Sequence, residues 1–192
     1  MSGARGKVWV VPRAHPDRVR DRRPRRVGGE YRKQQGQDLL GVRYRGAHGH
    51  GMRVSIVQFI KGAHSIGQET FFRRRAEADY HVMDEGFTWE RQDRERDTRA
   101  AQAAWEQARR LLADPTFDMV VIDELNIALK YNYVPLAQVP EALHARPVRQ
   151  HVVVTGCGAP PELIELADMV TEMRAVKHTF QAGVRAQKGI EL

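Results

Sequence analysis

Three short, almost wholly apolar runs, separated by segments of helical length, constrain the fold of this chain more than any other feature. They are RVSIVQFI at 53–60, FDMVVI at 117–122 and HVVVT at 151–155. A strand that is apolar on both sides is buried on both faces of its sheet, which is the usual condition of strands in parallel sheets. Alternation of such strands with helices predicts an α/β fold, with a parallel sheet covered by helices on both faces.

Helical periodicity fills the intervals between these runs. Over 93–113, small and apolar residues recur at steps of three and four until Asp114-Pro115 ends the pattern. The buried face of this helix should consist of Ala101, Ala104, Trp105, Ala108, Leu111 and Leu112. We expect a shorter helix over 134–145, a helix opened by Pro160 that runs to residue 166, and a last strand over 168–173.

Polar residues follow the apolar runs at 58–62, 123–126 and 155–158, and ligands of parallel sheets bind beyond these carboxyl ends. Asp123 and Glu124 come directly after a buried run, where two carboxylates are costly unless a metal ion or a helix N-terminus compensates them. In nucleotide-binding α/β proteins a carboxylate at this position holds Mg²⁺. A solvated strand-to-helix turn with Asp123 as the N-cap explains the pair equally well at this stage.

An aromatic stretch, GFTW at 86–89, has Tyr80, His81 and Met83 just before it. Aromatic residues near a glycine usually belong to the core. Charged residues flank this stretch within a long connection, which also allows a mobile loop. Such a loop could cover an apolar face of a large planar ligand.

Basic residues are concentrated at the N-terminal end. Residues 1–46 hold 13 Lys/Arg and 4 Asp/Glu, a balance of +9, whereas residues 47–192 hold 18 and 20, a balance of −2. Neither helical nor strand periodicity is visible around VGG at 27–29 or RRPRR at 22–26. The composition predicts a disordered basic segment at 1–46 and one α/β domain at 47–192. A basic arm could instead bind nucleic acid or another polyanion.

The compartment follows from cysteine usage and hydropathy. The single cysteine, Cys157, allows no disulfide framework and favours a reducing environment. No apolar run reaches the roughly 18 residues of a membrane span, and the Arg-rich N-terminus lacks the apolar region of a secretory signal. We therefore expect a cytoplasmic protein that does not engage a membrane.

The sequence resembles the corrinoid adenosyltransferases of the bacterial cobalamin-synthesis type, from about residue 47 to the C-terminus. The strings that carry the resemblance are VQFIKG (57–62), GFTW (86–89), RLLADPTFDMVVIDELNIALKYNYVPL (110–136), VVVTG (152–156), PPELIELADMVTEM (160–173) and VKHTFQAGVRAQKGIE (176–191). Their combination is far more specific than a lone glycine pattern.

This resemblance implies a P-loop NTPase-like (RecA-like) fold that binds Mg-ATP beside a reduced corrinoid, cob(I)alamin or cob(I)yrinic acid a,c-diamide. Co(I) would attack the ribose C5′ carbon, forming the adenosyl–cobalt bond and releasing triphosphate. Because Co(I) is already a strong nucleophile, the protein mainly has to align C5′ with cobalt and neutralise the leaving group.

Site residues are carried over from the family position by position. Phe87 and Trp89 correspond to aromatics that close the lower face of the corrin, which keeps an axial base away and makes Co(II) easier to reduce. Asp123 and Glu124 correspond to the Mg²⁺ carboxylates. Phosphate or ribose contacts are expected from Lys61, Gly62, Asn126, Lys177 and His178, although His178 is equally well explained by ordinary packing. The resemblance also implies a homodimer and an electron donor such as a reduced flavoprotein.

One element of the family is missing from the sequence. The family places a Gly-rich loop, G-x-x-x-G-K-T, after its first strand, where backbone N–H groups cradle phosphates and the lysine neutralises them. No such loop occurs in residues 1–46. Cys157 is a smaller departure, because the family usually has arginine there, and the loss of that cation could weaken triphosphate or corrinoid contacts.

A shifted reading frame accounts for the missing loop. Read one base later with permitted synonymous codons, YRKQQGQDLLGVR at 31–43 becomes TGNSKGKTSSAFG, the expected loop. VGG at 27–29 similarly yields Leu-Val-Val, the expected strand. We infer that residues up to about 46 derive from a shifted frame, which leaves the first strand and the P-loop degraded.

Three functions remain open on the sequence. The first is an adenosyltransferase impaired by the loss of its P-loop, and the second is an inactive corrinoid- or partner-binding remnant. The third is a nucleic-acid-binding protein acting through the basic arm, which ranks last because the arm lacks the interleaved aromatics of a single-strand platform. Binding to nucleic acid should weaken steeply with salt, whereas corrinoid binding should not.

Overall fold

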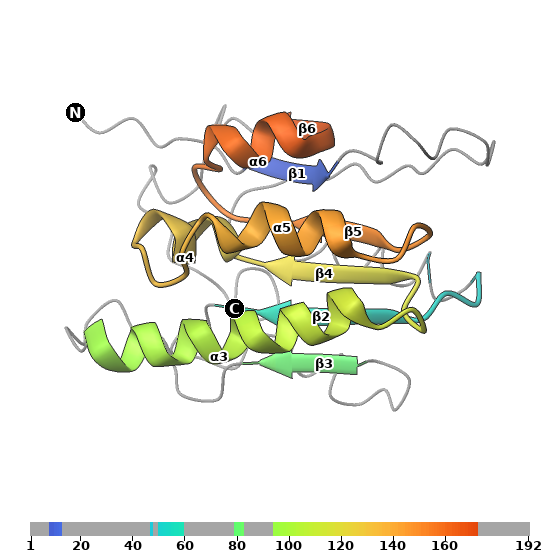
Figure 1. Cartoon of the computed structure of the whole chain (residues 1–192), viewed down its shortest axis with the longest axis horizontal. Coiled ribbons are helices and arrows are strands. Elements are labelled where there is room, and N and C mark those ends of the chain that lie inside the picture. The colour runs from blue at the N-terminus through green and yellow to red at the C-terminus, as the bar shows by residue number, and fades with distance from the viewer. Residues whose placement is uncertain (1–7, 13–46, 48–49, 60–78, 83–93, 173–192) are drawn as a thin grey trace, which may run out of the picture.

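The computed structural model describes residues 8–12, 47, 50–59, 79–82 and 94–172 (Figure 1). Six strands in this part of the chain form one sheet. They are β1 (Val8–Pro12), β2 (Val54–Gln58), β3 (Asp79–Val82), β4 (Met119–Asp123), β5 (His151–Val154) and β6 (Ala167–Glu172). Their order across the sheet is β3-β2-β4-β5-β1-β6.

Four neighbouring strands, β3, β2, β4 and β5, run parallel, which confirms the predicted α/β class. The three apolar runs of the sequence form β2, β4 and β5, and all their residues are buried except His151, which is half-buried. Gln58 pairs with Asp123 in the register between β2 and β4. The carboxyl ends of these two central strands are therefore level, and the residues at those ends are neighbours in space.

The strand β1 differs from the sequence-based expectation. It lies within the segment where no regular element was expected, yet it pairs antiparallel with both β5 and β6. Because β1 runs against both neighbours, β6 has the same direction as β5, and β1 is the reversed member among the six described strands (Figure 1). The predicted disorder of residues 1–46 otherwise concerns residues that the structure does not describe and stays a prediction.

The described helices are α3 (Arg94–Ala113), α4 (Leu125–Lys130), α5 (Gln138–Ala145) and α6 (Pro161–Leu166). The buried residues of α3 are the six that its periodicity predicted, so that prediction is confirmed. α5 begins later than expected, at Gln138 rather than at Val134. Pro135 explains the difference, because proline disfavours helical backbone in the residue before it. Val134 is nevertheless buried in the core.

Two apolar clusters cover the two faces of the sheet. The larger one joins alternate residues of β2, β4 and β5 to α3, α5 and α6, which all lie in front of the sheet in Figure 1. The smaller one lies on the opposite face and consists of Ala47, Val54, Ile56, Met119, Val121 and Val153. The described helices therefore cover one face, and the helical cover predicted for the other face falls outside the described residues.

Trp105 anchors α3 to the sheet and to α5. Its side chain is 2% exposed, and its indole N–H donates a hydrogen bond of 3.1 Å to Oε1 of Gln138 at the start of α5. One side chain therefore fills the centre of the larger cluster and also joins two helices. No helix within the described ranges is long and apolar enough to cross a membrane.

We expect Trp105→Ala to lower the free energy of unfolding by about 3–5 kcal/mol, because it leaves a cavity in the larger cluster. Denaturant unfolding followed by circular dichroism measures this change. The matched control is Glu106→Ala on the exposed side of the same helix, which should change stability by less than about 0.5 kcal/mol. Similar losses in the two variants would contradict the assigned orientation of α3.

Candidate functional site

The carboxylate of Asp123 occupies the centre of the carboxyl edge of the sheet. Asp123 is the last residue of β4 and is 7% exposed. Thr155, just after β5, donates a 2.5 Å hydrogen bond to Oδ1, and Gln58 at the end of β2 donates from Nε2 to Oδ2 at 3.3 Å. Since β2 and β5 lie on either side of β4, the two neighbouring strands hold the carboxylate from both sides.

Thr155 links the ends of β4 and β5 through its side-chain hydroxyl and its backbone carbonyl oxygen. Its hydroxyl donates to Asp123 and accepts a 3.0 Å hydrogen bond from the backbone N–H of Glu124. Its carbonyl oxygen accepts from the backbone N–H of Asn126 at 3.3 Å. One threonine therefore fixes the side chain that ends β4 and also the turn into α4.

Glu124 makes the turn between β4 and α4. It is 9% exposed and adopts left-handed backbone geometry, with φ 63° and ψ 20°, at the N-cap position of α4. For a residue with a Cβ this conformation costs on the order of 1–3 kcal/mol, and such strain is concentrated at functional sites. The alternative in which Asp123 is the N-cap of a solvated turn is wrong, because Asp123 is buried within β4 and the cap is Glu124.

Gly156 allows α4 to approach the loop after β5. Its φ is +133°, and a Cβ placed there would lie 2.8 Å from Cβ of Asn126 and 3.1 Å from its backbone nitrogen. The amide of Asn126 donates from Nδ2 to the carbonyl oxygen of Gly156 at 3.3 Å. Asn126, a predicted ligand contact, is thus fully buried beside the two acidic residues.

The oxygen donors of this edge fit magnesium. Asp123 and Glu124 are two buried carboxylates at consecutive positions. In the part of the chain that the structure describes, no group of three or more His, Cys, Asp or Glu side chains could hold a metal ion. Two neighbouring carboxylates suit Mg²⁺, which proteins commonly bind through one or two carboxylates while substrate phosphates and waters complete the shell.

The other predicted site residues cannot be compared with this geometry, because they lie outside the described residues. They are Lys61, Gly62, Phe87, Trp89, Lys177 and His178. The free Cys157 follows Gly156 and is half-buried, next to the site. Tyr80 and His81, which precede the aromatic stretch at 86–89 in the sequence, belong to β3.

Sequence reasoning included Gln58 and Thr155 in the strand ends where ligands were expected but assigned them no role, and it missed Tyr80. Gln58 and Thr155 stand at the carboxyl ends of predicted strands, which was a usable signal for their position. Their partner could not be inferred, since it depends on the order and register of strands distant in sequence. Tyr80 donates a 2.8 Å hydrogen bond to Oε1 of Gln58, and the local sequence of β3 gives no sign of this contact.

Comparison with known proteins adds to this geometry. Residues 33–192 match the family model of the ATP:corrinoid adenosyltransferase BtuR/CobO/CobP. The chain belongs to this family. The match begins ahead of the boundary near Ala47 that composition indicated, and it confirms both the enzyme class and the P-loop NTPase-like fold.

Relatives within the family are similar over most of their length. The chain is 62% identical to a corrinoid adenosyltransferase of Pseudomonas aeruginosa over 146 residues, which is 76% of this chain and 72% of that protein. It is 49% identical to the corrinoid adenosyltransferase CobA of Salmonella typhimurium and 47% identical to that of Escherichia coli, in each case over 145 residues, 76% of this chain and 74% of the relative. The predicted resemblance is therefore confirmed.

We expect Gly156→Ala to destabilise the protein and to disturb the acidic edge, because the new methyl group would overlap Asn126. Steric overlap in a packed site typically costs about 1–3 kcal/mol, and the positive φ adds strain. Thermal unfolding of the variant measures the loss. Gly158→Ala is the matched control, since it also has a positive φ (+71°) but nothing within 4 Å of its Cβ position. Equal losses in both variants would show that backbone strain, and not contact with Asn126, sets the cost.

Proposed function

We propose that this chain transfers the 5′-deoxyadenosyl group of ATP to the Co(I) centre of a corrinoid. The electron pair of Co(I) forms the bond to C5′, the C5′–O bond breaks, and triphosphate leaves with its electrons. The observation that carries the proposal is family membership over residues 33–192, combined with buried Asp123 and Glu124 at the carboxyl edge of the parallel sheet.

Asp123 and Glu124 would hold magnesium at this edge. When bound there, the ion would offset the negative charge that develops on the departing triphosphate. The protein fixes Asp123 through Thr155 and Gln58, so the carboxylate needs little reordering when the nucleotide arrives. We assign Asn126 to the ribose or phosphate side of the same site, together with Lys61, Gly62, Lys177 and His178.

Phe87 and Trp89 would cover the lower face of the corrin substrate. Their rings would keep water and an axial base from cobalt, which favours reduction of Co(II) by a donor such as a reduced flavoprotein. We further propose that the protein works as a homodimer in the cytoplasm, on cob(I)alamin or on cob(I)yrinic acid a,c-diamide.

The N-terminal segment would limit this activity. A parallel strand beside β5 would deliver a Gly-rich loop to the carboxyl edge, next to Thr155. β1 fills that place in the opposite direction, with Val8 paired to Glu172 and Pro12 paired to Ala167, so the chain after Pro12 leaves from the amino edge. This direction and the absence of G-x-x-x-G-K-T from the sequence support a weakened nucleotide site.

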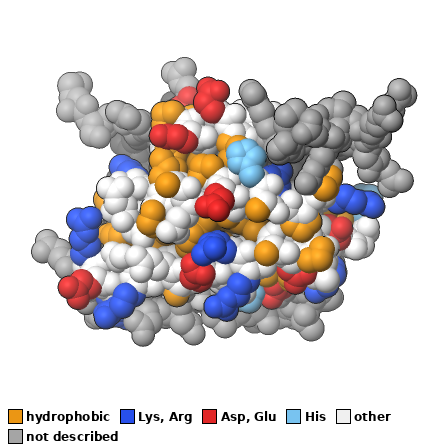
Figure 2. All heavy atoms as spheres, viewed as in Figure 1, with side chains coloured by type: hydrophobic (Ala, Val, Ile, Leu, Met, Phe, Trp, Pro, Cys, Tyr) orange, Lys and Arg blue, Asp and Glu red, His pale blue; other side chains and the backbone are white. Residues whose placement is uncertain are grey.

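Two other functions are less well supported. An inactive remnant would bind a corrinoid or partner protein without transferring an adenosyl group, and it differs from the enzyme only in turnover. Nucleic-acid binding would rely on the basic segment at 1–46. On the face of the described residues seen in Figure 2, basic and acidic side chains are interspersed, which gives this alternative no added support.

We expect the chain to bind Mg-ATP about a hundredfold or more weakly than a version with the reading frame restored over residues 1–46. Charge-assisted hydrogen bonds contribute roughly 1.5–3 kcal/mol each, and the missing loop removes several together. Isothermal titration calorimetry of both chains gives the ratio, and Asp123→Asn in each tests the metal carboxylate. Micromolar Mg-ATP binding by the chain as it stands would refute this expectation.

Trp89→Ala in the frame-restored chain should slow adenosylation that starts from Co(II) and should leave the reaction of chemically reduced Co(I) nearly unchanged. The reason is that a ring covering the corrin face assists the reduction step, which supplied Co(I) bypasses. The two rates are measured by the absorbance change of the corrin. If Trp89 is instead a core residue, both rates fall together and the melting temperature drops as well.

A further inference from the structure

A network of hydrogen bonds crosses the four parallel strands and reaches the carboxyl ends of β2, β4 and β5 from the second residue of β3. The hydroxyl of Tyr80 in β3 donates to Oε1 of Gln58 in β2 at 2.8 Å, and Nε2 of Gln58 donates to Oδ2 of Asp123 in β4 at 3.3 Å. Thr155 after β5 completes it with the 2.5 Å bond to Oδ1. Gln58 is 3% exposed and shielded from solvent, whereas Tyr80 at the outer end of the network is half-buried.

The acceptor-only carboxylate of Asp123 fixes the direction of this network. A glutamine amide has one acceptor end and one donor end, a carboxylate only accepts, and a tyrosine hydroxyl can do either. The NH₂ group of Gln58 therefore faces Asp123, and Oε1 is left to accept from the Tyr80 hydroxyl. That hydroxyl holds the amide at its other end, so its loss would free the amide to move away from the carboxylate. Tyr80 therefore anchors Gln58 in the position in which it holds Asp123.

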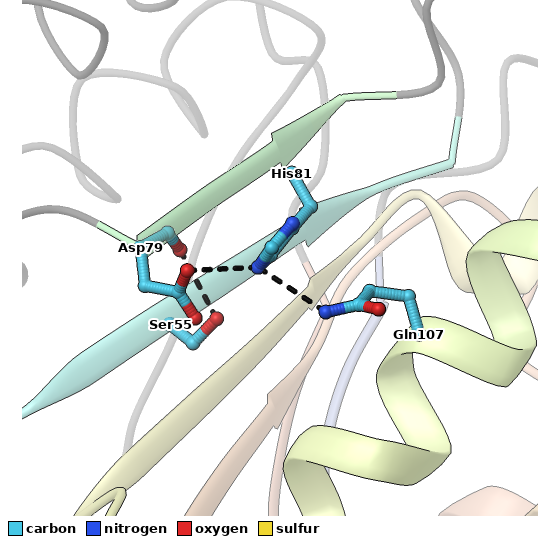
Figure 3. A network of polar contacts seen from close by, with 4 residues as sticks. All are labelled: Ser55, Asp79, His81 and Gln107. Carbon is cyan, nitrogen blue, oxygen red and sulfur yellow. Dashed lines mark hydrogen bonds and ion pairs between the residues drawn. The ribbon is translucent and has the colours of Figure 1, made fainter.

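Contacts of Asp79 and His81, on either side of Tyr80 in β3, fix this strand against β2 and α3 (Figure 3). Ser55 Oγ donates to the backbone oxygen of Asp79 at 3.0 Å, and Nε2 of His81 lies 2.9 Å from Oδ1 of Asp79 and 3.3 Å from Nε2 of Gln107 on α3. Successive side chains of a strand point to opposite faces. With Asp79 and His81 engaged on the side of α3, Tyr80 between them points to the opposite face, where it packs against the smaller apolar cluster.

We propose that Tyr80 and Gln58 are positioning residues that orient Asp123 toward its metal ion, with Tyr80 acting through Gln58. The inference rests on the proposed magnesium site. It adds two side chains that connect this site to β3, the edge strand of the sheet. Gln58 and Thr155 each occupy one oxygen of the carboxylate. A carboxylate has about four lone-pair sites in total, so acceptor capacity remains on both oxygens for a metal ion or its waters.

Binding of Mn²⁺, a paramagnetic substitute for Mg²⁺, tests the proposal on the whole chain, with and without ATP. The electron paramagnetic resonance signal of free Mn²⁺ gives the dissociation constant. Tyr80→Phe should raise it about 3- to 10-fold, consistent with the loss of one half-buried hydrogen bond. Ser55→Ala is the matched control, because it removes another hydroxyl hydrogen bond between β2 and β3 on the opposite face, and it should change the constant less than about 2-fold.

A double-mutant cycle tests whether Tyr80 acts through Gln58. Gln58→Met removes both ends of the amide and should weaken Mn²⁺ binding at least as much as Tyr80→Phe. Adding Tyr80→Phe to Gln58→Met should then have no further effect on Mn²⁺ binding. Melting temperatures of the same variants show whether any loss comes from unfolding. Equal weakening by Tyr80→Phe and Ser55→Ala would overturn the proposal in favour of a purely structural role.

The failure of this inference and that of the proposed function have different signatures. If Asp123→Asn leaves Mn²⁺ binding unchanged, the proposed metal site is wrong, and Tyr80 and Gln58 cannot position a metal ligand. If Asp123→Asn weakens Mn²⁺ binding while Tyr80→Phe and Gln58→Met do not, the metal site is supported and the positioning role of Tyr80 and Gln58 is refuted. Weakening by all three variants, with Ser55→Ala near the unsubstituted value, supports both.

Discussion

The hydrogen bond between Thr155 and Asp123 is the contact on which the rest of the site depends. A carboxylate at the end of a buried strand is unfavourable unless donors surround it, and this bond joins it to the neighbouring strand. The same hydroxyl accepts from the N–H of Glu124 and so stabilises a left-handed residue where β4 turns into α4. The turn at Glu124 also places Asn126 beside Gly156. Thr155 therefore compensates the charge of Asp123, supports the backbone geometry of Glu124, and contributes to the packing of α4 at this edge.

Parallel pairing explains how residues far apart in sequence meet at this edge. The strands β2, β4 and β5 each contribute a side chain at or just after their carboxyl ends, and β3 contributes Tyr80, which pairs with Ile56 in the register. The order β3-β2-β4-β5 puts Asp123 in the middle of this row and Tyr80 at its outer end. The apolar faces above and below fix the register, because a shift by one residue would exchange buried and polar side chains. The core therefore aligns the site as well as stabilising the fold.

Local sequence patterns predicted the parts of the structure that depend on local periodicity. The apolar runs gave β2, β4 and β5, and the spacing along 93–113 gave the buried face of α3. β3 (DYHV) was missed because it is an edge strand without an apolar run, and α4 because five of its six residues are buried, which leaves no amphipathic pattern. The carboxylates were found at the right strand end. Gln58 and Tyr80 were not, because their role depends on the order in which strands assemble, which no local pattern encodes. The strand VWVVP was missed although its five residues are apolar, because the segment around it is rich in basic residues.

The reversed direction of β1 shows that the sheet can form around a strand of opposite direction. Backbone hydrogen bonds can join a strand to its neighbours in either orientation, and β1 ends with Pro12 at the amino edge of the parallel strands. A purified sample would thus show cooperative thermal unfolding and the circular dichroism spectrum of an α/β protein, whichever segment lies between β5 and β6. For members of this family, a spectrum typical of a folded protein does not show that the phosphate-binding loop has formed.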